Sequence, residues 1–221
     1  LIAPIILVAT QPDLGTSILI AAGGIVVAWL AGVRAKFFVL SGIAMLALLP
    51  VAISFLKPYQ KSRILTFLNP ERDPLGAGYQ IIQSKIAIGS GGLFGKGFLN
   101  GSQSYLDYLP EKHTDFIFTL FSEEFGFFGS LFILLLYALI ISRIIKIGNM
   151  TRSNFGKLYC YSFATAFFLY VVVNMMMVLG LLPIVGSPLP IMSYGGSSMM
   201  AIMFGLGIVM SCKIYKDVPV N

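Results

Sequence analysis

Residues 158–212 read LYCYSFATAFFLYVVVNMMMVLGLLPIVGSPLPIMSYGGSSMMAIMFGLGIVMSC, and no charged residue interrupts them. A helix that crosses a bilayer needs about 20 predominantly apolar residues, so this run is too long for one crossing. Pro183, Pro188 and Pro190 divide it, because proline is poorly tolerated inside a helix. The run therefore predicts two membrane-spanning helices, over residues 158–182 and 197–212, joined by a short outer loop over residues 184–196.

Three other stretches are long and poor in charge. Residues 14–33 and 37–56 contain no charged residue, and residues 116–142 contain only Glu123 and Glu124. Each stretch is long enough to cross a bilayer. Residues 1–10 are apolar but too short, which indicates part of a further helix. The predicted fold class is an all-α polytopic membrane protein with about five complete transmembrane helices and a partial N-terminal one, with a long outer loop containing short helices.

The composition excludes an ordinary soluble domain. Hydrophobic residues make up 57% and charged residues 11% of the 221 residues, whereas soluble domains have about 25% charged residues. The formal charge is +6, but no basic cluster with interleaved aromatic residues is present, which argues against nucleic acid as a partner. Basic residues at 34–36, 143–157 and 213–216 instead predict cytoplasmic turns and a cytoplasmic C-terminus. Residues 57–115 then form a long extracytoplasmic loop of a single membrane domain, residues 1–221.

The long outer segment contains two recognisable stretches. In GYQIIQSKIAI, residues 78–88, four isoleucines come close to helical spacing (Ile81, Ile82, Ile86 and Ile88). This stripe predicts a helix that lies either along the membrane interface or buried against the bundle. The following GSGGLFGKG, residues 89–97, fits neither the Walker nor the dinucleotide-binding glycine pattern. Its five glycines predict tight backbone turns close to a ligand or to another helix.

Ionisable residues gather at the end of this segment, in YLPEKHTDFIF, residues 108–118. Ionisable groups at the edge of a membrane span are expensive to desolvate, so they are candidate functional residues. They are Glu111, Lys112, the only histidine His113, and Asp115. The alternative is a structural role, in which Thr114 or Asp115 caps the helix that begins near Phe116. From these residues alone both interpretations of Asp115 stay open.

Other polar residues near the predicted spans have two interpretations each. Glu123 and Glu124 lie inside a span and indicate either a polar contact to a neighbouring helix or the lining of a cavity. Asp13, in QPDLGT, is either a helix cap or an acid in a cavity. In the last outer loop, Ser193 lies beside the turn, and Ser197 and its neighbour can cap the final span or present its N-terminus to an anion.

Several long motifs resemble those of the SEDS family (shape, elongation, division and sporulation), and more closely its elongation than its division members. They are QPDLGT at 11–16, FLNPERDPLGAGYQIIQSKIAIGSGGLFGKG at 67–97, YLPEKHTDFIF at 108–118, EEFG at 123–126 and PLPIMSYGGSS at 188–198. The resemblance implies the C-terminal part of a ten-span protein of the bacterial inner membrane. Such proteins are peptidoglycan glycosyltransferases, which polymerise lipid II and work with a class B penicillin-binding protein that crosslinks the glycan.

The resemblance also implies a site. In this family the acid of the HTDFIF motif is essential, and it falls on Asp115, for which we predict a general-base role. Lys112, Lys96 and Lys85 are predicted partners of the leaving diphosphate, and a divalent cation such as Mg²⁺ or Mn²⁺ is a further candidate, although the sequence offers no dedicated metal cage. The remaining candidate substrate-binding residues are Glu111, His113, Ser193, Ser197, Asp13 and Glu124. The implied partners are lipid II, polyprenyl-linked glycan and membrane lipids.

Two other functions fit parts of the sequence. A flippase or transporter of lipid-linked precursors also places acids and flexible glycines among its helices. A noncatalytic scaffold for a class B penicillin-binding protein needs only helix contacts. Transport without glycan synthesis would identify the first, and growth supported by an Asp115 variant would identify the second.

Overall fold

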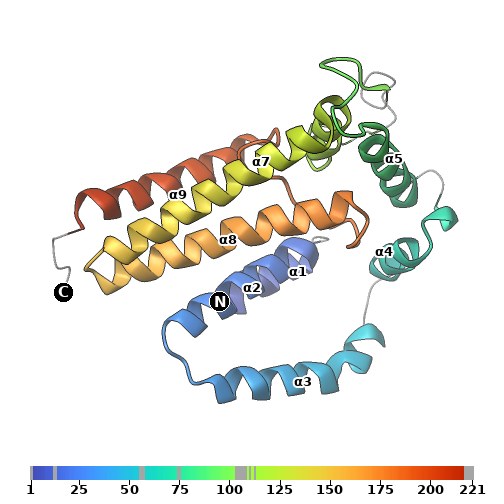
Figure 1. The fold of residues 1–221 in the computed structure, drawn as a ribbon. Helices are drawn as coiled ribbons and strands as arrows, with labels where there is room; N and C mark the ends of the chain where they lie inside the picture. Colours follow the sequence, from blue (N-terminus) through green and yellow to red (C-terminus); the bar gives the residue numbers. More distant parts are fainter. Residues whose placement is uncertain are drawn as a thin grey trace.

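Long helices form the body of the protein. The computed structural model describes residues 2–11, 14–54, 58–73, 76–102, 109, 111 and 113–216. The regular structure within these residues is helical and includes no strand, which confirms the predicted all-α class. Three of the described helices are long and apolar enough to cross a membrane, so the protein is a multi-pass membrane protein (Figure 1). They are α7 (Ile117–Met150), α8 (Asn154–Val178) and α9 (Gly196–Ile214).

Three helices precede the long outer segment. They are α1 (Ile2–Thr10), α2 (Leu14–Leu30) and α3 (Ala35–Ser54), and a turn that contains Arg34 separates the last two, as predicted. α2 packs against α8, and α1 packs against α2, whereas α3 runs apart from the bundle (Figure 1). Among the described residues, the apolar portions of α2 and α3 are Gly15–Leu30 and Ala35–Ala44, and both are shorter than a full crossing. Complete crossings by α2 and α3 therefore stay predictions.

The outer segment folds into short helices, as predicted: α4 (Pro58–Leu68), a 3₁₀ turn η1 (Pro70–Arg72) and α5 (Ala77–Ser90). α5 packs against α7 and α8. Its buried face is not the predicted isoleucine stripe, because Ile86 is exposed. The buried residues recur every third position and are mostly small: Gly78, Ile81, Ser84 and Ala87. Small side chains let the backbones approach closely, which favours packing between helices in a membrane.

Hydrogen bonds made by Ser84 also favour burial of this face of α5. Its hydroxyl donates to the carbonyl of Val178 at 2.7 Å and shares a hydrogen bond of 2.8 Å with the hydroxyl of Thr119. The side chains of Ser84 and Thr119 are both fully buried. In a membrane protein, interhelical hydrogen bonds and close packing replace much of the hydrophobic effect, because lipid is as apolar as the core. One serine therefore joins α5, α7 and the end of α8.

Glycines allow close packing between α8 and α9. A Cβ atom at Gly205 of α9 would lie 2.2 Å from the ring of Phe163, and one at Gly156 of α8 would lie 3.3 Å from the sulfur of Cys212. The loop between these helices begins earlier than predicted, because α8 ends at Val178 and Gly180 follows with φ 66°. α9 begins at Gly196, one residue before the predicted start.

α7 is interrupted at Gly126, whose φ of 66° and ψ of −160° lie outside the helical region. Glycine adopts this conformation without the penalty that a side chain would bring. In a continuous helix the N–H groups of Phe127 and Phe128 would donate to the carbonyls of Glu123 and Glu124, four residues earlier. The interruption breaks both of these bonds.

A loop from the outer segment provides new hydrogen-bond partners for these two N–H groups and two carbonyls. We call residues 91–99 the splice loop. The N–H groups after the break donate to two of its carbonyls, and two of its N–H groups donate to the carbonyls before the break: Phe127 to Gly92 at 2.9 Å, Phe128 to Leu93 at 3.2 Å, Lys96 to Glu123 at 3.0 Å and Gly97 to Glu124 at 3.0 Å. The splice loop thus replaces two helical hydrogen bonds with four bonds between segments.

Close contact explains the glycines of this loop. A Cβ atom at Gly91 would lie 2.2 Å from the carbonyl oxygen of Ser122, and one at Gly95 would lie 2.0 Å from that of Glu124. Gly95 also has a φ of 79°. The prediction of tight turns against a ligand or another helix is confirmed in its second form, since the neighbour is α7.

Candidate active site

Residues 113–115, just before α7, are held by their main-chain carbonyls. The carbonyl of His113 accepts from the N–H of Tyr194 at 2.9 Å, and that of Thr114 accepts from the hydroxyl of Ser193 at 2.6 Å. The carbonyl of Asp115 accepts from the carboxamide Nδ2 of Asn174 at 2.8 Å. Three consecutive carbonyls are therefore bound by α8 and by the loop that follows it. This arrangement fixes the backbone from which the Asp115 side chain projects.

The opposing loop is held by the same side chains. Ser193 accepts from the N–H of Leu189 at 2.7 Å, and Asn174 donates its second Nδ2 proton to the carbonyl of Ser187 at 2.7 Å. The phenol of Tyr137, on α7, donates to the carbonyl of Pro190 at 2.7 Å. The predicted candidates Asp115, His113 and Ser193 thus come together, although residues 115 and 193 are far apart in the sequence.

Neither Thr114 nor Asp115 occupies the N-cap position of α7. The N-cap position of α7 is Phe116, which is buried, so both residues precede it. The hydroxyl of Thr114 donates to Glu111 Oε2 at 2.8 Å, and the N–H of Phe116 donates to the Glu111 carbonyl at 3.2 Å. Glu111 therefore shapes the turn before the helix. The predicted serine cap of α9 is also absent, because its N-cap is Gly195 and the Ser198 hydroxyl donates back to the Gly195 carbonyl.

The Asp115 side chain is half-buried and faces the loop after α8. A Cβ atom built on Gly186 would lie 3.6 Å from Asp115 Oδ2, so the loop passes close to the carboxylate. Beside this segment is an open pocket of about 460 Å³, lined by His113, Ile117, Ile191, Met192, Ser193, Tyr194 and Met199. Two residues close to Asp115 in the chain, His113 and Ile117, therefore line this cavity, whereas the carboxylate itself lies toward Gly186.

Asn174 is a site residue that the sequence analysis did not identify. It is fully buried, and its Oδ1 has no hydrogen-bond partner among the described residues; the same is true of the buried Ser187 hydroxyl. The available signal was a carboxamide in the apolar run VVVNMMMV, because a polar side chain within a membrane span needs a specific partner.

We expect Asn174→Leu to destabilise the protein. Leucine cannot donate, so the buried carbonyls of Asp115 and Ser187 would each lose a donor, at about 1–3 kcal/mol for each unsatisfied group. The measurement is the midpoint of thermal unfolding of the purified full-length protein in detergent. Asn154→Leu, at an exposed position of the same helix, is the matched control. Equal midpoints for the two variants would contradict the assigned role of Asn174.

The predicted lysines lie in different places. Lys96 binds the buried Glu123: the distance from Nζ to Oε1 is 2.7 Å, and Ser102 bonds to both groups at 2.8 and 3.1 Å. The polar contact predicted for Glu123 is present, but its partner is in the splice loop and not on a neighbouring helix. Lys85 is exposed, and its Nζ lies 2.8 Å from a Cβ position at Gly180, where a cation is favourable near the C-terminus of α8.

The remaining candidates are placed as follows. Glu124 is half-buried, and its carbonyl belongs to the splice in α7. Ser197 is exposed in the first turn of α9. Lys112 and Asp13 lie outside the described residues. Among the residues that are described, no three His, Cys, Asp or Glu side chains group closely enough to hold a metal ion, so a divalent cation stays a prediction that involves the substrate.

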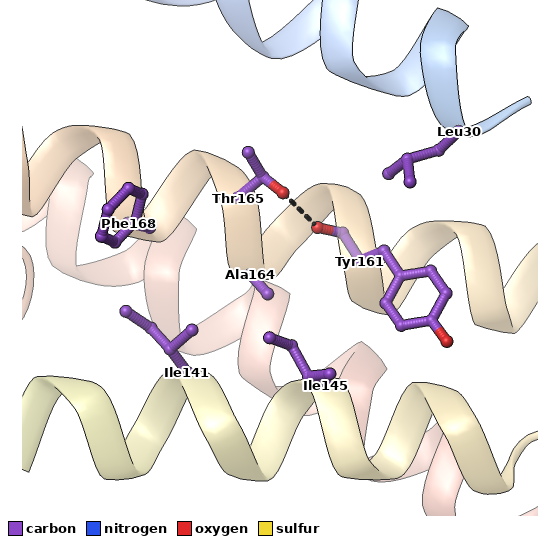
Figure 2. Close-up of a pocket in the computed structure, with 7 residues that line it drawn as sticks. All are labelled: Leu30, Ile141, Ile145, Tyr161, Ala164, Thr165 and Phe168. Atoms are coloured by element: carbon purple, nitrogen blue, oxygen red, sulfur yellow. Dashed lines mark hydrogen bonds between the residues drawn. The ribbon is translucent and has the colours of Figure 1, made fainter.

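A second pocket shows the apolar interior of the membrane part. It has a volume of about 340 Å³ and lies between the end of α2, α7 and α8 (Figure 2). Its only hydrogen bond among the side chains drawn runs from the Thr165 hydroxyl to the Tyr161 carbonyl, within one helix. Ile141, which lines it, is about 36 Å along α7 from Ile117 at 1.5 Å per residue. This pocket is therefore remote from Asp115.

Comparison with known proteins agrees with this architecture. Residues 1–217 match the family of FtsW, RodA and SpoVE, described as cell cycle proteins. Peptidoglycan glycosyltransferase MrdB of Escherichia coli K12 is 50% identical over 214 residues, which cover 96% of this chain and 58% of that protein. The chain thus spans less than two thirds of the length of this relative.

Two solved structures are similar along most of the chain. One comes from work on the structural coordination of polymerization and crosslinking by a peptidoglycan synthase complex; it has a TM-score of 0.77 and 37% identity, and the match covers 96% of this chain and 59% of that one. The other is RodA of Thermus thermophilus, with a TM-score of 0.62, 28% identity and coverage of 96% and 53%. The predicted resemblance is confirmed: this chain belongs to the FtsW/RodA/SpoVE family of membrane proteins.

Proposed function

We propose that the full-length protein is a peptidoglycan glycosyltransferase that polymerises lipid II during cell elongation, with Asp115 as its general base. The observation that carries this proposal is the set of hydrogen bonds to the main-chain carbonyls of residues 113–115, which we call the clamp. Three carbonyls bound in succession fix the backbone of the half-buried Asp115, and its chain neighbours His113 and Ile117 line an open pocket. Catalytic groups need such a fixed position, because orientation contributes a large part of the rate enhancement. The names of the relatives support the same reaction.

The reaction needs a base and a site for a leaving anion. The 4-hydroxyl of the acceptor sugar attacks the anomeric carbon of the lipid-linked donor, and Asp115 takes the hydroxyl proton. As the new glycosidic bond forms, the bond from that carbon to the diphosphate breaks, and polyprenyl diphosphate departs with the electron pair. General-base assistance of this kind contributes about 10²–10⁴-fold in rate.

Several groups are candidates to stabilise the departing diphosphate. Lys85 is exposed, and Lys112 is adjacent in sequence to His113. α9 begins with no side-chain cap, so its first N–H groups and its dipole favour an anion near Ser197. Lys96 stays in the proposal as a weaker candidate, since its ammonium already binds Glu123.

The polyprenyl chain requires an apolar surface next to the site. A pocket of about 360 Å³ lies between α8, α9 and the loop that joins them, with Phe167, Tyr170, Pro188, Pro190 and Ile202 in its lining. It shares the 187–193 loop with the Asp115 clamp, and we infer that it receives the first isoprene units. We also propose that a class B penicillin-binding protein is the partner, that the chain lies in the bacterial inner membrane, and that its C-terminus is cytoplasmic.

The test is a reconstitution that separates synthesis from transport. The full-length protein in proteoliposomes is supplied with labelled lipid II, with and without the penicillin-binding partner, and two products are measured: glycan chains and lipid II moved between leaflets. Glycan chains made by the wild-type protein would support the proposal. Translocation without glycan would identify a transporter, and the absence of both, with the partner still bound, would identify a scaffold.

A further inference from the structure

The splice loop, residues 91–99, has an unusual surface for a loop outside a helix bundle. Its four large apolar side chains are between 60% and 80% exposed: Leu93, Phe94, Phe98 and Leu99. Leu99 even holds a φ of 62°, a region that is unfavourable for a residue with a side chain. Such a contiguous apolar patch indicates contact with a partner, a ligand or a membrane.

The loop carries only one charged residue, and that charge is paired. The ammonium of Lys96 binds the fully buried carboxylate of Glu123 at 2.7 Å and the hydroxyl of Ser102 at 2.8 Å. The Lys96 side chain stays 30% exposed, as suits a cation at the polar margin of a membrane. The rest of the loop has no charged side chain.

Part of the backbone of the loop is bonded inside the protein. A backbone polar group without a partner is costly in the bilayer core, so an irregular segment near the membrane is favoured where its polar groups are bonded. Here the N–H groups of Lys96 and Gly97 and the carbonyls of Gly92 and Leu93 bond to α7, and the N–H of Gly95 donates to Gly91 at 2.8 Å. These groups need no water.

The depth of the loop follows from α7. Residues 125–142 carry no charge and, at 1.5 Å per residue, extend about 27 Å, close to the roughly 30 Å of the hydrocarbon layer. Gly126, where the loop joins, is at one end of this stretch. The rings of the loop continue the exposed face of the span: Phe94 lies 5.4 Å from Phe128, and Phe98 lies 6.3 Å from Phe125, between centroids.

We propose that the splice loop is embedded in the edge of the bilayer, with its apolar side chains in contact with lipid acyl chains. The occupant that we propose for this surface is lipid, because the patch is continuous with the exposed apolar side of α7 that includes Phe127, Leu131 and Phe132, and α7 is long and apolar enough to cross a membrane. The loop is then an anchor in the membrane. This inference does not depend on the reaction that the protein catalyses.

Fluorescence quenching by lipid tests the proposal. In the full-length protein, with the native tryptophans including Trp29 replaced by Phe, a single tryptophan is placed at Phe94 and the protein is reconstituted in vesicles of brominated phosphatidylcholine. Phe132→Trp, in the span, and Asn154→Trp, at the exposed start of α8 beside Arg152 and Lys157, are the membrane and water controls. We expect quenching of Phe94→Trp to match that of Phe132→Trp and to exceed that of Asn154→Trp several-fold.

The depth adds a second criterion. Bromines near the headgroup end of the acyl chain are expected to quench Phe94→Trp more strongly than bromines near the methyl end. Phe98→Trp provides a second position if the first variant does not fold. Strong quenching by aqueous iodide with little quenching by brominated lipid would overturn the proposal. Protection from both quenchers would also overturn it, because the loop would then be covered by protein.

Discussion

The Asp115→Asn variant of the full-length protein is expected to lose lipid II polymerisation by at least about 10²-fold, the lower bound for removal of a general base. Asparagine has the same shape as aspartate but cannot take the proton of the acceptor hydroxyl. The fold should survive, because asparagine keeps the shape of aspartate and the main-chain carbonyl of residue 115 still accepts from Asn174. The measurement is glycan chain formation from lipid II, together with the thermal unfolding midpoint.

Glu71→Gln is the matched control for this experiment. It neutralises an exposed carboxylate of the same outer segment, in η1, and should leave both polymerisation and stability unchanged. Retained polymerisation by Asp115→Asn would remove Asp115 from the mechanism. A lower unfolding midpoint with normal turnover per folded molecule would show that the residue is structural.

The second large effect is expected for Lys96→Met. Glu123 is fully buried, and removal of the cation leaves its carboxylate without the charge that balances it. Loss of one partner of a buried ion pair costs about 3–5 kcal/mol. For a chain of this size each kcal/mol shifts Tm by about 2–4 °C, so the expected loss is about 6–20 °C.

A double variant distinguishes the effect of an unbalanced charge from the effect of changed packing. Lys96→Met with Glu123→Gln removes both charges, and replacement of a whole buried pair is often close to neutral, so most of the lost stability should return. Lys61→Met, which removes an exposed lysine of α4, is the control for loss of positive charge. If Lys96→Met and Lys61→Met have the same Tm, the ion pair contributes nothing measurable to stability.

The positions of the spans could be predicted because a membrane imposes a length and excludes charge. Charge-free runs located α7, α8 and α9 to within a few residues at most ends. The largest deviation is the end of α7 at Met150, beyond Arg143 and Lys146, since basic side chains near a helix end can extend to the interface. Periodicity also predicted the helix over 78–88, although it assigned the wrong buried face.

Contacts between distant segments could not be predicted in this way. Asn174 and Tyr194 reach residues 113–115 only because α7, α8 and the loop after α8 meet in space. The splice at Gly126 depends on a loop about thirty residues earlier in the chain, and no local pattern of EEFG indicates that the helix breaks there. For the same reason the sequence did not indicate that Lys96 binds Glu123.

The amino-acid sequence by itself determined the membrane class, the approximate bounds of α7, α8 and α9, the family, and the choice of Asp115 as the candidate base. These properties depend on composition, on span length and on motifs that are contiguous along the chain. Only the tertiary structure decided which groups hold Asp115, how α7 continues past its break and where the single cation of the splice loop points. Hydrogen bonds and ion pairs act over about 3 Å, so they depend on proximity in space, which residue spacing along the chain does not report.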